Sequence, residues 1–202
     1  MRTMIAVPCM DMVHTFFFTS MLSMRKPEGT ELAVASCSLI YEARHNLAMK
    51  AINDGFDRVL WMDSDMNFGP DLMERLEADL DQGYDFVTGL YFTRKNPVKP
   101  CVYEVCHPKK RKTGEIYPAA ENVKKLPAGI FEIEGCGFGC VMMTTELMKA
   151  CGEIPFFPME GYGEDLTFCR KARAAGYKLY CDPTIKADHL GISIINETQW
   201  RM

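Results

Sequence analysis

The sequence predicts an α/β protein with a central sheet that is mixed but mostly parallel. Three observations support this fold class. The first two-thirds of the chain alternates short β-rich runs with helical patterns, an order typical of right-handed βαβ units. The 202 residues are 48% hydrophobic, which is enough for one domain with a buried core. A hydrophobic run at 60–62 leads directly into two Asp residues, at the point where open α/β sheets bind their ligands.

The elements of the first half each have their own sequence signal. We expect strands at 4–7, 31–36, 58–62 and 85–90, and helices at 14–25, 39–53 and 70–80. The helix at 39–53 repeats apolar residues at every fourth position, and Gly55 ends it. Pro70 suits a helix start because the first turn leaves its amide groups without helical partners.

The second half is less regular. Residues 91–127 contain five prolines and the basic run Lys109–Lys112 beside a β-like stretch at 101–105, so we expect a hairpin or flap on the sheet edge. The basic run could be a solvated loop or could hold an anionic acceptor. Further expected elements are strands at 130–134 and 178–181, helices at 144–151 and 163–175, and a tail at 189. Gly135, Gly137 and Gly139 would permit close backbone approach.

Charge and cysteine usage exclude several classes of protein. A formal net charge of −4 argues against broad affinity for nucleic acid or anionic membranes. No run of 18 apolar residues occurs, and Pro8, Asp11 and His14 interrupt the N-terminal stretch, so neither a membrane span nor a cleaved signal peptide is expected. The nine cysteines are an odd number without a Cys-x-x-Cys pair, which supports neither zinc nor a disulfide framework. With 15 methionines, they indicate a reducing cytoplasm.

Asp63 and Asp65 are the strongest chemical signal. They stand two residues apart directly after a strand, so the period of a strand points both carboxylates the same way. Paired carboxylates at a strand end suit a hard cation such as Mg²⁺ or Mn²⁺ that carries a substrate's phosphates. An Asp at a strand end can equally cap the next turn.

Glu164 and Asp165 open the helix expected at 163–175. The helix dipole and free backbone amides explain an acidic residue in a first turn, and this explains Glu164 well. Asp165 instead heads the apolar stripe of Phe168 and Ala172, so it should face the sheet. A carboxylate there is costly without a partner, and beside an open pocket it could act as a general base.

Arg44 and His189 each allow two interpretations. Arg44 lies on an apolar face of its helix, where its side chain could extend to solvent or aim its guanidinium at a phosphate or carboxylate near the strand ends. His189 could be structural or could ligate an Mn-like ion.

The order of these motifs carries a family resemblance. Along the chain come Val7-Pro8, Arg44-His45-Asn46, Asp63-Ser64-Asp65, the Gly-rich segment 134–139, Gly163-Glu164-Asp165 with Arg170, Asp182-Pro183 and His189-Leu190-Gly191. In this order they resemble the GT-A fold glycosyltransferases, family 2-like, over nearly the whole chain. The runs 38–44 and 61–66 resemble the compact phage- or prophage-type members.

The resemblance implies a single GT-A domain over 1–202, Rossmann-like, with a nucleotide-binding half at 1–90 and an acceptor-binding half at 91–202 that includes the flap at 91–127. It implies a metal-dependent glycosyltransferase that moves a sugar from a nucleotide-diphosphate sugar, with a UDP-sugar favoured, to an acceptor hydroxyl, inverting the anomeric carbon by direct displacement. The acceptor would be a saccharide, a wall polymer, a protein or a modified nucleic acid.

The resemblance also implies roles for single residues. Pro8, Asp11 and Gly137 would shape the nucleotide pocket, and Arg44 would face the donor nucleotide. Asp63 would lie near the ribose and the metal, while Asp65 and His189 would complete the site for Mn²⁺ or Mg²⁺. Asp165 would be the base, and Glu164 would bind the acceptor. The segment Gln199-Trp200-Arg201 differs from the Gln-x-x-Arg-Trp of processive synthases, so single transfers are expected.

Three alternatives belong to other classes. A noncatalytic nucleotide-sugar-binding protein would keep the fold without turnover. A phosphatase or phosphotransferase of the haloacid dehalogenase type also uses Asp-x-Asp, but after its first strand, whereas Asp63 and Asp65 follow the third. A sugar-nucleotide pyrophosphorylase would carry a Gly-rich basic loop after the first strand, where this chain has Pro8-Cys9-Met10-Asp11.

Overall fold

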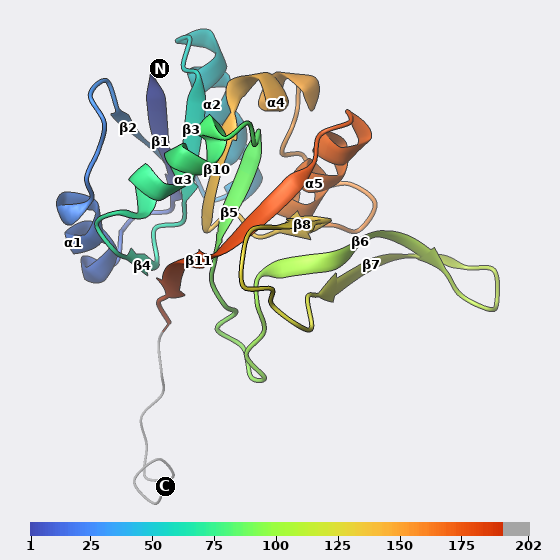
Figure 1. Cartoon of the computed structure of the whole chain (residues 1–202). Helices are drawn as coiled ribbons and strands as arrows, with labels where there is room; N and C mark the ends of the chain where they lie inside the picture. Colours follow the sequence, from blue (N-terminus) through green and yellow to red (C-terminus); the bar gives the residue numbers. More distant parts are fainter. Residues whose placement is uncertain (192–202) are drawn as a thin grey trace, which may run out of the picture.

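The computed structural model describes residues 1–191, so the Gln199–Arg201 segment lies outside the described residues. A central sheet of eight strands organises the described chain (Figure 1). Its strands follow the order β2 (Glu31–Ser36), β1 (Thr3–Cys9), β3 (Arg58–Met62), β10 (Cys140–Thr144), β5 (Phe86–Leu90), β11 (Leu179–His189) and β4 (Met66–Phe68), with β8 (Phe131–Ile133) also paired to β11.

The sheet is mixed, with most strands in one direction. β1 pairs in parallel with β2 and β3, and β11 pairs in parallel with β5. β10 runs antiparallel between β3 and β5, and β4 and β8 run antiparallel to β11. Five strands therefore end at one edge of the sheet, β2, β1, β3, β5 and β11. The predicted fold class is confirmed.

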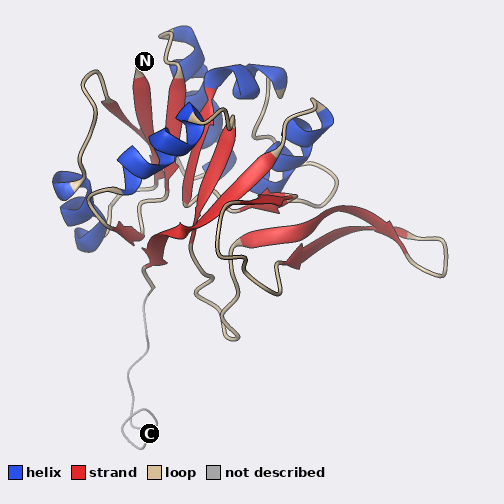
Figure 2. Ribbon diagram, in the orientation of Figure 1, coloured by secondary structure: helices blue, strands red, loops and turns tan. Residues whose placement is uncertain are grey.

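Helices cover both faces of the sheet (Figure 2). One core contains side chains from α2 (Ile40–Asn53), α4 (Thr145–Ala150) and α5 (Glu164–Ala174). The other contains side chains from α1 (Thr15–Ser23) and α3 (Leu72–Asp81). Neighbours along a strand alternate between the cores, since Trp61 of β3 belongs to the first and Leu60 to the second.

The flap is a long hairpin that projects from the sheet (Figure 2). β6 (Val102–Lys110) pairs with β7 (Ile116–Asn122) and with the short β9 (Gly135–Cys136). The Tyr162 hydroxyl accepts a 2.9 Å hydrogen bond from the amide of Ala119 and donates one of 3.2 Å to its carbonyl. Glu134 joins the hairpin to α5, accepting a 2.7 Å bond from the Cys106 amide and lying 3.3 Å from Arg173. The root of the hairpin is therefore fixed against the helix that carries Asp165.

The expected helices and strands are present, with three differences. The helix predicted from Pro70 begins at Leu72, because Gly69 and Pro70 form the turn before it, where the amide of Leu72 donates to the carbonyl of Gly69 at 3.3 Å. The closing strand predicted at 178–181 continues to His189, which ends a strand rather than lying in a tail. The strands β4, β7, β9 and β10 were not predicted as separate elements.

The cysteines behave as small core residues. All nine are free thiols, and seven of them are buried. Cys136, Cys169 and Cys181 are among the members of the α2–α4–α5 core.

None of the helices within residues 1–191 is long and apolar enough to cross a membrane.

Candidate active site

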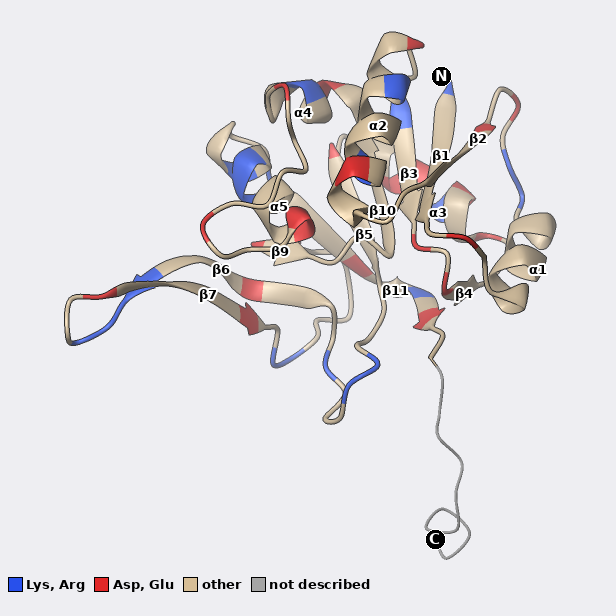
Figure 3. Cartoon of the chain, turned by 180° about the vertical axis from the view of Figure 1, so that it is seen from behind, with Lys and Arg blue, Asp and Glu red and all other residues tan. Residues whose placement is uncertain are grey.

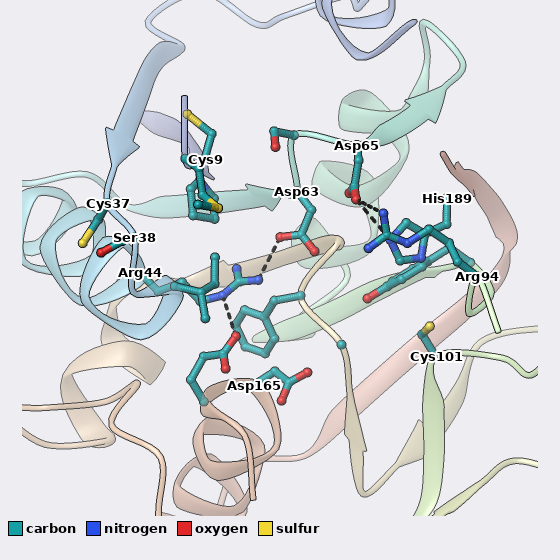
Figure 4. Close-up of a pocket in the computed structure, with 18 of the residues that line it drawn as sticks. Cys9, Cys37, Ser38, Arg44, Asp63, Asp65, Arg94, Cys101, Asp165 and His189 are labelled. Atoms are coloured by element: carbon teal, nitrogen blue, oxygen red, sulfur yellow. Dashed lines mark hydrogen bonds and ion pairs between the residues drawn. The ribbon is translucent and has the colours of Figure 1, made fainter. Parts of the chain in front are cut away.

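A pocket of about 510 Å³ opens at the edge where the parallel strands end (Figure 4). Its lining includes the last residues of β1, the residues that follow β3 and β5, and the end of β11. Of the residues predicted from the sequence, it brings together Pro8, Arg44, Asp63, Asp65, Gly137, Glu164, Asp165 and His189. Asp11 is exposed and does not line this pocket.

Arg44 is buried and forms ion pairs with two acidic residues from different elements. Its guanidinium Nη2 lies 2.8 Å from Asp63 Oδ1, and its Nε lies 3.3 Å from Glu164 Oε1 (Figure 4). The side chain is 3% exposed and sits over the ring of Phe138, with 5.3 Å from Cζ to the ring centroid. Burial lowers the pKa of Arg44, but Asp63 and Glu164 outweigh it, so the pKa stays above its ordinary value. Arg44 is therefore a fixed cation that joins α2, the end of β3 and the start of α5.

Asp65 has two cationic or basic neighbours. Its Oδ2 lies 2.8 Å from Arg94 Nη1 and 3.5 Å from His189 Nε2, and the other ring nitrogen of His189 lies 3.1 Å from the carbonyl of Phe92. Burial raises the pKa of Asp65, but the hydrogen bond from His189 and the charges of His189 and Arg94 outweigh it, so the pKa lies below its ordinary value. Asp63 and Asp65 thus face one pocket but bind different partners.

The donor atoms in this pocket are chemically suited to Mn²⁺ or Mg²⁺, although the protein supplies few of them. Asp65 Oδ2 lies near His189 Nε2 but is also paired with Arg94, and Asp63 Oδ1 is paired with Arg44. Within residues 1–191, no group of three or more His, Cys, Asp or Glu side chains is arranged to hold a metal ion. The predicted set of Asp63, Asp65 and His189 is therefore only partly brought together. A cation here would need oxygens from a bound diphosphate or from water, as is common for Mg²⁺.

Asp165 lies at the inner wall of the pocket, at the start of α5. Its Oδ1 accepts a 2.7 Å hydrogen bond from the amide of Leu166. Burial raises the pKa of Asp165, and the neighbouring charge of Glu164 adds to this, so the pKa rises from 3.8 to about 6. A carboxylate with this pKa is ionised at neutral pH and can still accept a proton, as a general base must.

The glycines at 137 and 139 make room for Tyr91. The Tyr91 hydroxyl accepts a 3.0 Å hydrogen bond from the amide of Gly139, and a Cβ on Gly137 would overlap that hydroxyl. A Cβ on Gly139 would lie 2.9 Å from Cζ of Tyr91. The predicted close approach is confirmed, and the group that approaches is an aromatic side chain.

Tyr91 and Arg94 are site residues that the sequence analysis missed. Both follow β5, whose carboxyl end lies at the pocket. Asp63 and Asp65 were found because ligands bind beyond the carboxyl ends of strands, and the same rule applied to β5 would have found Tyr91 and Arg94.

No protein family model matches the sequence, and no curated protein matches it. Many solved structures match the fold, and two of them superpose on almost the whole of this chain. A197 from STIV superposes with a TM-score of 0.69 at 22% identity, over 98% of this chain and 87% of that one. GalNAc-T7, solved with UDP, GalNAc and Mn²⁺, superposes with a TM-score of 0.64 at 10% identity, over 94% of this chain. Both are GT-A-like structures.

The chain has the GT-A fold. Its residues span 44% of the length of GalNAc-T7, so the match concerns one part of that protein. The superpositions show a shared GT-A fold. Because the sequence identities are only 22% and 10%, they do not test the family 2-like or phage-type assignments, which stay predictions. The fold nevertheless helps to interpret the pocket, because the acidic residues of the pocket lie at the edge of the sheet where open α/β sheets bind ligands.

Proposed function

We propose that this protein is a metal-dependent glycosyltransferase, family 2-like, that moves a sugar from a nucleotide-diphosphate sugar to an acceptor hydroxyl. The observation that carries the proposal is one pocket, at the carboxyl edge of a GT-A sheet, that combines Asp63, Asp65 and His189 with the half-buried Asp165. The alternative phosphatase chemistry needs Asp-x-Asp after the first strand, whereas here Asp63 follows β3.

The donor end of the pocket is proposed to hold the nucleotide diphosphate. Pro8 and Gly137 would shape the space for the nucleotide, and Asp11 would lie outside the pocket wall at its approach. Asp65 and His189 would hold Mn²⁺ or Mg²⁺, with Asp63 kept near the ribose by Arg44. The bound cation would offset the charge of the leaving diphosphate. A UDP-sugar is the favoured donor, in line with the UDP and Mn²⁺ of the GalNAc-T7 structure.

Asp165 is proposed to be the catalytic base. Its raised pKa and its place in the pocket wall support removal of a proton from the acceptor hydroxyl, whose oxygen then attacks the anomeric carbon. Direct displacement of this kind inverts that carbon. Glu164, held by Arg44 on the neighbouring position of α5, is proposed to bind the acceptor. The free thiols support a reducing location, for which we propose the cytoplasm.

A donor panel tests the proposal. Nucleotide sugars are incubated with the protein, Mn²⁺ and candidate acceptors, and release of the free nucleotide is measured. We expect Asp165→Asn to fold and to bind donor, but to lose at least about 10²-fold in rate. Asp71→Asn, at a half-buried carboxylate before α3 that does not line the pocket, is the matched control and should keep its rate. Donor binding without release of nucleotide in any combination would favour the noncatalytic sugar-nucleotide binder.

A further inference from the structure

Positive charge is concentrated in one segment of the chain. Residues 94–125 hold nine Lys and Arg against three Asp and Glu, a formal net charge of +6 in a protein whose net charge is −4. Figure 3 shows these basic residues on the loops at the base of the hairpin and toward its tip, with a smaller number of acidic residues on the hairpin itself. Residues 94–125 therefore form a basic surface on a protein whose remaining residues carry a net negative charge.

Five lysines of this surface have no ion-pair partner among the described residues. We call Lys95, Lys99 and Lys125 the mouth lysines, and Lys110 and Lys112 the tip lysines. All five are exposed and form no ion pair within residues 1–191. The remaining basic side chains of the segment are paired, namely Arg94 with Asp65, Lys109 with Glu121, Arg111 with Glu115 and Lys124 with Glu104.

The mouth lysines lie on the loop after β5, which lines the proposed active site through Tyr91 and Arg94, and on the loop after β7. Lys95 adjoins Arg94, which lines the pocket. Lys99 and Lys124 line a second cavity of about 450 Å³ between the loop after β5 and the loop after β7. The side-chain amide of Asn122 donates a 2.7 Å hydrogen bond to the carbonyl of Pro100, which holds these two loops together. Basic side chains from the loop after β5 and the loop after β7 therefore lie together, and we call this surface the rim.

The spacing of the two groups requires an extended partner. β6 runs from the rim toward the tip over nine residues, and at about 3.3 Å per residue this is roughly 30 Å. A single sugar or nucleotide cannot reach both groups. A linear chain with repeated negative charges can lie along the hairpin, with each lysine contributing an exposed point charge.

The chemistry at both ends of the surface favours an acidic polysaccharide. Single-stranded nucleic acid needs open aromatic faces for stacking, but the aromatic residues of β6 and β7, Tyr103 and Tyr117, are half-buried, and Arg111 lies over the Tyr117 ring at 5.1 Å. At the acceptor side of the pocket, the carboxylate of Asp165 would repel an anionic group but can receive a neutral hydroxyl.

We propose that the hairpin and the rim bind a linear acidic polysaccharide and present one of its hydroxyls to the pocket as the acceptor. This assignment of the acceptor rests on the proposed glycosyltransferase function. The binding surface itself does not depend on catalysis, and it can be measured without a donor.

Fluorescence anisotropy with a labelled oligogalacturonate of about 12 sugars tests the binding. We expect the tip variant K110E/K112E and the mouth variant K95E/K99E each to weaken binding at least about 10-fold at low salt, and added salt to weaken the wild type. The control K50E/K149E makes the same charge change on α2 and α4, far from the hairpin in Figure 3, and should bind as the wild type does.

The outcomes separate this proposal from the proposed function. An equal loss of binding in the control variant, or unchanged binding in both the tip and the mouth variants, would contradict the proposed binding surface. Neutral dextran should not bind. Tighter binding of oligo(dT) or polyglutamate of matched charge would overturn the choice of a polysaccharide. The thermal shift caused by UDP with Mn²⁺ should be the same in all variants, and its absence, with oligogalacturonate binding intact, would contradict only the donor site.

Discussion

Arg44 Nη2 lies 2.8 Å from Oδ1 of Asp63 and links the start of α2 to the end of β3. The same guanidinium reaches Glu164 through Nε, while its Nη1 has no hydrogen-bond partner among the described residues. A buried cation between two carboxylates holds Asp63 and the helix that carries Asp165 at a fixed separation. Arg44 is therefore a positioning residue for both.

Removal of this cation should destabilise the protein. Arg44→Met keeps the apolar contact with Phe138 but leaves two partly buried carboxylates unpaired, and we expect the free energy of unfolding to fall by about 3 kcal/mol. Urea denaturation measures this loss. Arg25→Met, which breaks the exposed pair between Arg25 and Glu74, is the control and should change little. A similar small effect at Arg44 would contradict its structural role.

The raised pKa of Asp165 should appear in the pH dependence of stability. The folded protein holds this proton up to about pH 6, whereas the unfolded chain loses it near 3.8. Because the folded state then binds more protons, stability should fall as the pH rises from about 4 to about 6, by up to about 3 kcal/mol. Asp165→Asn should lose its own share of this dependence, while the share of Asp79, whose pKa burial also raises to about 6, should remain, as thermal unfolding at several pH values can show.

The same proton should control the rate of sugar transfer. A base acts only when it is deprotonated, so the rate should rise through about pH 6 and level off above it. Values of kcat/KM measured from pH 4.5 to 8, which report the groups of the free enzyme, check this expectation. A rate that is flat across this range would argue against Asp165 as the base.

UDP should bind more tightly when a divalent cation is present. At 100 times the dissociation constant, a ligand stabilises the folded state by about 2.7 kcal/mol, so UDP with Mn²⁺ should raise the melting temperature clearly. We expect a much smaller rise with EDTA, in Asp65→Ala and in His189→Ala. Asp71→Ala serves as the control. Equal shifts in all of these conditions would refute the metal site.

Packing of Tyr91 against two glycines gives a double-mutant test. Gly137→Ala should destabilise the protein because the new methyl overlaps the Tyr91 hydroxyl, and Tyr91→Phe should relieve this, since Cζ lies 3.4 Å away. Gly139→Ala should not be relieved, because its methyl would contact Cζ itself at 2.9 Å. We expect a coupling energy of about 1–2 kcal/mol in the first cycle, and none in the second, from urea denaturation.

Much of the GT-A fold could be predicted because its strands and helices have local signals. The alternation of β-rich runs and helical patterns located β1, β2, β3, β5 and all five helices. β10 was missed because Cys140–Thr144 is a short apolar run that directly follows a Gly-rich stretch and directly precedes a helix. Such a run has no alternation to distinguish a strand from a buried helix segment.

The candidate site was predictable where a residue's own position carried the signal. Asp63 and Asp65 follow a hydrophobic strand, and Asp165 heads an apolar stripe, so each could be found from its neighbours in the chain. The contact between Arg94 and Asp65 depends on the loop after β5 returning to the end of β3, which no local pattern records. For Arg44, the sequence left two equal options, extension to solvent or contact with a phosphate or carboxylate, and burial between Asp63 and Glu164 excludes the first.

The reversed strand β10 also ties the folding of the first ninety residues to the rest of the chain. β3 and β5 belong to residues 1–90, yet they do not pair with each other, because β10 fills the space between them with bonds to both. When only residues 1–90 have left the ribosome, β3 and β5 are present, but β10, which pairs with both, has not yet emerged. The joining of β3 and β5 into one sheet must wait until residue 144 has emerged, and the pocket until Asp165 and His189 have followed.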